Sequence, residues 1–333
     1  MNDQGLVNVE RALTFEKLAR HLPDSVCNAF EPFLPPVVWC GNGRPPISNR
    51  DCLHAAIFIL ISGTPWKLMP ACFPSYKTVR KRLRRWVEQE AFRQLWSASA
   101  CRYGLVRGIN FDQLSIDGAR KPSKKGGAAT GPNPTDRAKS GTQVVVVASA
   151  EDLPLGAAIC SASQQDATFT QRALASVVVP LPLDEASQPL GQLPVQGRAR
   201  LSRAERRRYR RGLFRRRNRD GRLSEAVRRA LQIELDQGQD LRALPYLRGD
   251  GNFAKVPARC DAKRAGFRLW APDRSKRQSR RGLGVVRSAV ERVHALLNQF
   301  GRVFRRLDRD DNLYLAWVQL ACCIIFLRRG FFP

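Results

Sequence analysis

The stretch LGVVRSAVERVHALLNQF, residues 283–300, decides what fold this chain is expected to have. Its apolar residues recur at spacings of four, three and four, which is one face of an α-helix: Val286, Val290, Val293 and Leu297. A polar stripe is shifted from them by one residue: Arg287, Glu291, His294 and Asn298. Neighbouring helical residues lie about 100° apart, so this stripe flanks the buried seam. The pattern therefore predicts a helix that holds the Glu291 carboxylate at the edge of a core.

Two aspartates elsewhere in the chain are candidates to meet Glu291. Asp117 follows an apolar stretch and precedes a glycine, which predicts the end of a short strand. Asp250 follows the strand-like residues 244–248 in a Gly-Asp-Gly-Asn sequence. Carboxylates from separate elements commonly hold a pair of Mg²⁺ or Mn²⁺ ions. Each acid also has an ordinary interpretation, because the aspartates could close turns and Glu291 could pair with Arg287.

Further strand and helix patterns surround these acids. Four successive valines in residues 142–148 predict a buried strand. A loop rich in Gly, Pro and Lys is expected over residues 120–141. The remaining patterns predict strands at 155–160 and 267–270 and helices at 167–179 and 312–327. Strands and helices mixed in this way predict an α/β domain.

The N-terminal part of the chain predicts two helices joined by a loop. Ser48 and Asp51 form a capping-box-like start for a helix that ends at Gly63. A second helix begins near Ser75 and carries six cations within ten residues: Lys77, Arg80, Lys81, Arg82, Arg84 and Arg85. This arrangement resembles a helix-turn-helix DNA-binding module. The alternative is an ordinary amphipathic helix with a solvated basic face.

The charge of the chain predicts a polyanionic partner. The net charge is +28, and residues 201–300 alone hold 27 basic and 10 acidic residues. Nucleic acid is the first candidate for such a surplus, and an anionic membrane is the weaker one. The nine cysteines contain no C-x-x-C pair and there are three histidines, which makes a zinc site improbable and suggests free thiols in a reducing cytoplasm. The apolar run 313–327 is too short to span a bilayer, so no membrane partner is expected.

An insertion is expected between the strand patterns. Residues 180–243 are first rich in Pro and Gln and then rich in Arg. The segment could be a DNA-binding insertion, because arginines grip phosphates well. It could equally be a surplus without a folded role.

Six segments in order resemble the DDE transposases of bacterial insertion sequences, in the IS-four and IS-five superfamily. They are residues 30–96 with Gly63-Thr64-Pro65-Trp66, Ser115-Ile116-Asp117-Gly118, residues 131–141 with Pro134-Thr135-Asp136-Arg137, residues 247–253 around Asp250, residues 287–308 around Glu291, and Tyr314-Leu315-Ala316-Trp317-Val318. The resemblance implies a helical DNA-binding region (1–105), an RNase H-like catalytic domain with a mixed sheet flanked by helices (106–179 and 244–333), and the insertion 180–243.

The resemblance also implies an activity and its residues. The enzyme would bind the terminal inverted repeats of its element, cleave the DNA ends and join the 3′-OH ends to target DNA. Asp117, Asp250 and Glu291 would be the catalytic ligands of two Mg²⁺ or Mn²⁺ ions, with Arg287, His294 and Asn298 beside them. DNA contacts are expected from Lys77, Arg80, Lys81, Arg84, Arg85, Lys139, Arg206, Arg207, Arg210, Arg211 and Arg292. A homodimer acting in the bacterial cytoplasm at the nucleoid is implied.

The chain departs from the family pattern at two positions. The family has a tyrosine three residues before the arginine and a lysine seven residues after the glutamate, and this chain has Gly284 and Asn298 there. That lysine is expected to contact DNA, so His294 or Arg302 are candidates to replace it. The departures also leave open an alternative function, a catalytically impaired or repurposed transposase that acts as a DNA-binding protein.

Overall fold

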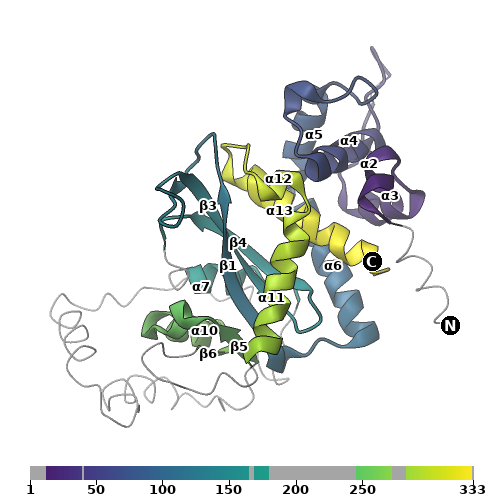
Figure 1. Cartoon of the computed structure of the whole chain (residues 1–333). Coiled ribbons are helices and arrows are strands. Elements are labelled where there is room, and N and C mark those ends of the chain that lie inside the picture. The colour runs from purple at the N-terminus through teal and green to yellow at the C-terminus, as the bar shows by residue number, and fades with distance from the viewer. Residues whose placement is uncertain (1–12, 40, 165–168, 180–244, 272–282, 332–333) are drawn as a thin grey trace, which may run out of the picture. The chain divides into compact units, whose positions relative to one another are not determined.

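The central element of the molecule is a six-stranded mixed β-sheet (Figure 1). The computed structural model describes residues 13–39, 41–164, 169–179, 245–271 and 283–331. The strands are β1 (Leu114–Pro122), β2 (Gly131–Pro132), β3 (Ser140–Ala148), β4 (Pro154–Ser161), β5 (Tyr246–Gly249) and β6 (Arg268–Trp270). β1, β3 and β4 pair antiparallel, whereas β5 pairs parallel with both β1 and β6. The mixed α/β class expected from the sequence is confirmed.

Helices cover both faces of the sheet because its central strand is apolar on both sides. Val144 to Val147 on β3 are all fully buried, as expected for a strand enclosed between two layers. α11 (Leu283–Asn298) packs against β1 and β3, and α13 (Asp311–Arg328) against β4. α7 (Thr170–Ala175) also packs against β3 and β4, and α10 (Val256–Arg264) packs against β6.

The N-terminal helices are α2 (Phe15–Arg20), α3 (Asp24–Phe30), α4 (Asn49–Ser62), α5 (Tyr76–Glu88) and α6 (Ala91–Arg107). The predicted start and end of α4 are confirmed. Ser48 accepts a hydrogen bond from the Asp51 backbone N–H at 3.0 Å, and Gly63 ends the helix in the left-handed region at φ 69°. α5 buries one apolar face, formed by Val79, Leu83 and Trp86. Of its basic residues, Arg80 and Arg82 are half-buried and the others are exposed.

α13 is longer than the apolar run 313–327 that had been judged too short to span a bilayer, but it lies mostly in the core. It has the length and hydropathy of a membrane-spanning helix, but 72% of its most apolar window is buried inside the protein. It packs against α6, and its N-terminus is capped by Asp310, whose carboxylate accepts from the Asn312 and Leu313 backbone N–H groups. The helix therefore stabilises the fold through its burial.

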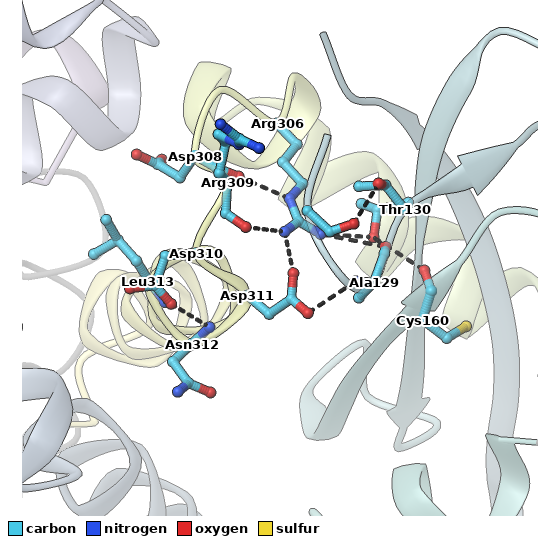
Figure 2. Close-up of polar contacts among 12 residues, drawn as sticks. Ala129, Thr130, Cys160, Arg306, Asp308, Arg309, Asp310, Asp311, Asn312 and Leu313 are labelled. Atoms are coloured by element: carbon cyan, nitrogen blue, oxygen red, sulfur yellow. Dashed lines mark hydrogen bonds and ion pairs between the residues drawn. The ribbon is translucent and has the colours of Figure 1, made fainter. Parts of the chain in front are cut away.

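A buried arginine cluster, formed by Arg302, Arg306, Asp308 and Asp311, joins α12 (Gly301–Phe304) to its surroundings. The Arg302 guanidinium meets both Asp308 carboxylate oxygens at 2.9 Å, and Trp317 donates to the same carboxylate. Arg306 donates to the backbone oxygens of Ala129, Asp308 and Arg309, to the Thr142 hydroxyl, and to Asp311 (Figure 2). The cluster fixes the connection between β1 and β2 to the start of α13.

Two glycines let the N-terminal helices touch this segment. A Cβ on Gly63, at the end of α4, would come within 2.9 Å of the Gly301 backbone, and a Cβ on Gly301 would come as close to Gly63. Arg302 also donates to the Thr64 carbonyl at 3.3 Å. The end of α4 and the start of α12 therefore meet backbone to backbone.

Several sequence-based boundaries were wrong. β1 continues to Pro122, so residues 120–122 are strand and not loop, and Asp117 lies within β1 and not at its end. β2 also interrupts the predicted loop, and α7 is shorter than the predicted helix 167–179. α6 and α10 had not been predicted. The division into domains at residues 105 and 106 stays a prediction, and the insertion 180–243 lies outside the described residues.

Candidate active site

The parallel pairing of β1 with β5 brings Asp117 and Asp250 to neighbouring positions. Its register matches Ser115 with Arg248 and Ile116 with Gly249, so the two aspartates are the next residues on adjacent strands. Adjacent strands lie about 4.8 Å apart. Both aspartates are half-buried. β5 ends at Gly249 while β1 continues, so the pair marks the point where this parallel ladder stops.

A tight turn holds Asp250 at the end of β5. The Phe253 backbone N–H donates to the Asp250 carbonyl at 3.0 Å, and Phe253 is fully buried. A Cβ on Gly249 would come within 2.8 Å of the Phe253 side chain, so only glycine allows the ring to fold back against the strand. The packing of Phe253 therefore explains the glycine at position 249, directly before Asp250.

α11 lies against β1 beside Asp117. His294 Nε2 is 3.3 Å from the Asp117 carbonyl oxygen, and the imidazole is 7% exposed. Burial, and secondly the Lys121 cation, lower the His294 pKa to about 4. The ring is therefore neutral near pH 7, and its Nε2–H donates to the carbonyl. Glu291, one helical turn earlier, is exposed.

Two properties of the aspartates suit a divalent metal ion: the chemistry of their carboxylates and the register of their strands. Carboxylate oxygens are the donors that Mg²⁺ and Mn²⁺ prefer, and the strand register supplies two of them side by side. Across the described ranges, no three His, Cys, Asp or Glu side chains form a group that could hold a metal ion. The structure thus brings Asp117 and Asp250 to adjacent positions, but among the described residues Glu291, on the neighbouring helix α11, does not join them in one metal-binding group.

Asn298 contacts a lysine that the sequence reasoning had missed. Lys121 lies on β1 with 3% of its surface exposed, and its Nζ donates to Asn298 Oδ1. Burial lowers the Lys121 pKa to about 8. Arg302, which had been considered as a replacement for the absent helix lysine, is instead buried against Asp308, with its guanidinium near the rings of both Trp66 and Trp317.

Comparisons with known proteins identify the family of this chain. Residues 22–96 match a family described as "Putative transposase of IS4/5 family (DUF4096)". Over 199 residues the chain is 32% identical to the "Putative transposase for insertion sequence element IS402" of Burkholderia cepacia, which spans 59% of this chain and 67% of that relative. The chain belongs to the transposases of insertion sequences. No solved structure matches it.

Membership in the transposases makes DNA the partner of this chain and transposition its function class. The family match covers α4 and α5, the helices that were predicted to bind DNA. On α5 of this transposase, Lys77, Lys81, Arg84 and Arg85 are exposed and Arg80 is half-buried. Spacings of four, three and one place the four exposed cations on the face opposite the buried seam.

The structure describes only some of the other residues that were predicted to contact DNA. Lys139 is exposed and pairs with Asp136 at 3.2 Å. Arg292 on α11 pairs with Asp152, in the turn between β3 and β4, at 2.7 Å. Outside the described part of the chain lie Arg206, Arg207, Arg210, Arg211 and the side chain of Arg287.

Proposed function

We propose that this transposase cleaves the ends of its element and joins the 3′-OH ends to target DNA. Asp117, Asp250 and Glu291 would be the catalytic carboxylates and would hold two Mg²⁺ or Mn²⁺ ions. The observation that carries the proposal is the register of β1 and β5, which makes Asp117 and Asp250 neighbours. The order of the strands, β4, β3, β1, β5 and β6, supports an RNase H-like catalytic domain.

The residues of the site would have separate roles in catalysis. When bound, the metal ions would supply an activated attacking oxygen and charge stabilisation at the leaving oxygen. Asp117 and Asp250 are anchored on strands, which gives them a rigid base. His294, neutral and buried, holds the Asp117 backbone against α11. No covalent intermediate on the protein is required, because water or a 3′-OH is the nucleophile.

DNA would be bound along the basic face of α5. The exposed cations Lys77, Lys81, Arg84 and Arg85 would contact phosphates of the terminal inverted repeats. A homodimer would bring two element ends together, and the reaction would take place at the nucleoid in the cytoplasm. Residues 1–105 would form the DNA-binding region.

A strand-transfer assay tests the catalytic assignment. The substrate is DNA that carries the ends flanking the encoding gene, with Mg²⁺ or Mn²⁺ present. Asp117→Asn, Asp250→Asn and Glu291→Gln should each lower turnover by at least 100-fold, an order-of-magnitude expectation for losing a carboxylate at the reacting centre. Asp24→Asn is the matched control, because Asp24 is exposed and pairs with Arg50 on the N-terminal helices. Turnover that survives any of the three site substitutions would overturn the assignment of that residue.

The salt dependence of DNA binding tests the α5 face. Each phosphate contact contributes about 0.9 to the slope of log K against log salt. The triple variant Lys77→Gln, Lys81→Gln, Arg84→Gln should therefore flatten that slope by roughly 2 to 3. The control Lys17→Gln removes an exposed cation on α2 and should leave the slope within error. An unchanged slope in the triple variant would move the DNA contact elsewhere.

A second candidate is a repurposed transposase that binds element ends without cutting them. The observation in its favour is the departure of Gly284 and Asn298 from the family pattern. Specific binding of the ends together with no cleavage in either Mg²⁺ or Mn²⁺ would favour this candidate. Inverted repeats and a short target duplication around the gene favour the active enzyme.

A further inference from the structure

Two hydrogen bonds join β1 to α11. His294 donates to the Asp117 carbonyl, and Lys121 donates to Asn298. Asp117 and Lys121 are four residues apart on the strand, and His294 and Asn298 are four residues apart on the helix. A single contact would leave the helix free to pivot, whereas two contacts define both its position and its direction along the strand.

These two contacts also align the carboxylates. β1 pairs with β3 in an unbroken register from Asp117 to Lys121, so the two side chains share one face of the strand. On α11, Glu291 and Asn298 are seven residues apart, or nearly two turns, so they share one face of the helix. A change at the Lys121–Asn298 contact is therefore transmitted to the relative position of Asp117 and Glu291.

Burial of the Lys121 ammonium group lowers the stability of the fold. Lysines are almost never fully buried without an acidic partner. Within the described part of the chain, Lys121 makes no ion pair with an acid, and its hydrogen bond goes to a neutral amide. His294 Nδ1 is likewise buried without a hydrogen-bond partner there. An apolar side chain at position 121 would satisfy the packing at lower cost, so stability alone does not account for this residue.

We propose that Lys121, held by Asn298, is a positioning residue that fixes α11 on β1 and thereby sets the placement of Glu291 relative to Asp117 for metal binding. This inference rests on the proposed function, because it assumes that the two carboxylates bind the metal ions.

The test compares three variants of the full chain: Lys121→Met, the exchange Lys121→Asn with Asn298→Lys, and the control Lys17→Met at an exposed site. Mn²⁺ affinity is measured by calorimetry and folding by urea denaturation. Loss of a supporting partner commonly weakens metal binding 10-fold to 100-fold, so Lys121→Met should raise the Mn²⁺ Kd by about 10-fold or more while its urea midpoint stays equal or rises. The exchange should recover most of the affinity, because it restores the bond with the partners reversed.

Asp117→Asn separates this inference from the proposed function. If Asp117→Asn abolishes Mn²⁺ binding and Lys121→Met leaves it unchanged, the positioning role is wrong and the proposed function stands. If Asp117→Asn binds Mn²⁺ like the parent chain, the proposed function fails and this inference fails with it. Loss of folding in both Lys121→Met and the exchange would also overturn the proposal, since it would show a purely structural tie.

Discussion

Buried cations hold helices in place at two regions of this molecule, and the two regions treat charge in opposite ways. In the arginine cluster, Arg306 directs its guanidinium to five acceptors (Figure 2). Arg302 faces both oxygens of Asp308. At the β1–α11 contact, Lys121 has an amide oxygen as its partner and no described acid. All three cations are almost completely buried.

This difference indicates that the two regions have different roles. A buried charge with all its donors satisfied stabilises one arrangement, and removing a partner is costly. A buried charge with few partners lowers stability, so it persists where another requirement holds it. The arginine cluster is accordingly a scaffold, whereas the lysine contact lies beside the candidate carboxylates. The following variants test this contrast.

The largest effect is expected from Asp308→Asn. The substitution leaves the Arg302 guanidinium buried without its counter-charge, and breaking a buried pair in this way costs about 3–5 kcal/mol. Urea denaturation measures the loss. The control Asp24→Asn breaks an exposed pair with Arg50 and should cost about 0–1 kcal/mol.

The same pair offers an internal check. Replacing both partners, Arg302→Leu with Asp308→Leu, removes the two charges together and should recover part of the stability lost in Asp308→Asn. Trp66 and Trp317 both donate to Asp308, and the amide oxygen introduced by Asp308→Asn can still accept from one of them, whereas the double variant removes both acceptors. A double variant less stable than the single one would show that the hydrogen bonds, and not the charge, dominate this cluster.

Arg306→Met should come next, with a loss of about 3 kcal/mol and a local signature. Arg306 and Asp311 bind the backbone oxygen and N–H of Ala129, which anchors the segment between β1 and β2. Lys124 and Lys125 in that segment are exposed, so trypsin should cut there faster in the variant. Unchanged cleavage, with Arg305→Met as the exposed control, would mean that other contacts anchor the segment.

Lys121→Met should have the opposite sign. Burial holds the Lys121 pKa at about 8 against an ordinary 10.5, a difference that corresponds to roughly 3 kcal/mol of instability below pH 8. Between pH 8 and 10.5 the unfolded chain keeps the proton and the folded chain loses it, so the parent protein should gain stability as the pH rises. The variant should therefore be more stable than the parent at pH 7, and the gap should close towards pH 10.5. A gap that is constant over this range would contradict the pKa.

The smallest effect is expected from Arg292→Gln. Arg292 pairs with Asp152 at the surface, where its side chain is half exposed, and such pairs contribute about 0–1 kcal/mol. The unfolding midpoint should be nearly unchanged. A loss close to that of Asp308→Asn would remove the distinction between exposed and buried pairs on which the comparison depends.

Local patterns were predictable from the sequence, and long-range pairings were not. The Ser48 cap, the Gly63 end of α4 and the apolar seam of α11 depend on neighbours within a few residues, and the structure has them where the spacing predicts. The alignment of Asp117 with Asp250 depends on strands more than 120 residues apart, so only the order of the motifs indicated it.

The basic residues misled the sequence reasoning most. Lys121 and Pro122 looked like loop residues, but pairing with β3 carries β1 through them and buries the lysine. Arg302 was a candidate to replace a DNA-contacting lysine, but it and Arg306 are almost completely buried. Composition cannot tell a buried, paired arginine from a solvated one, because its partners come from Thr64, Ala129 and Thr142, which are remote in sequence.

The backbone contact of Gly63 with Gly301 bears on how such chains can be recombined. If the helical region is exchanged with that of a relative, its residue at position 63 must leave room for the backbone at position 301. Its carbonyl at position 64 must also accept a hydrogen bond from Arg302. The N-terminal helices are thus not an interchangeable cassette. A chimera that takes residues 13–105 from a relative should fold only when residues 301–308 come from the same parent.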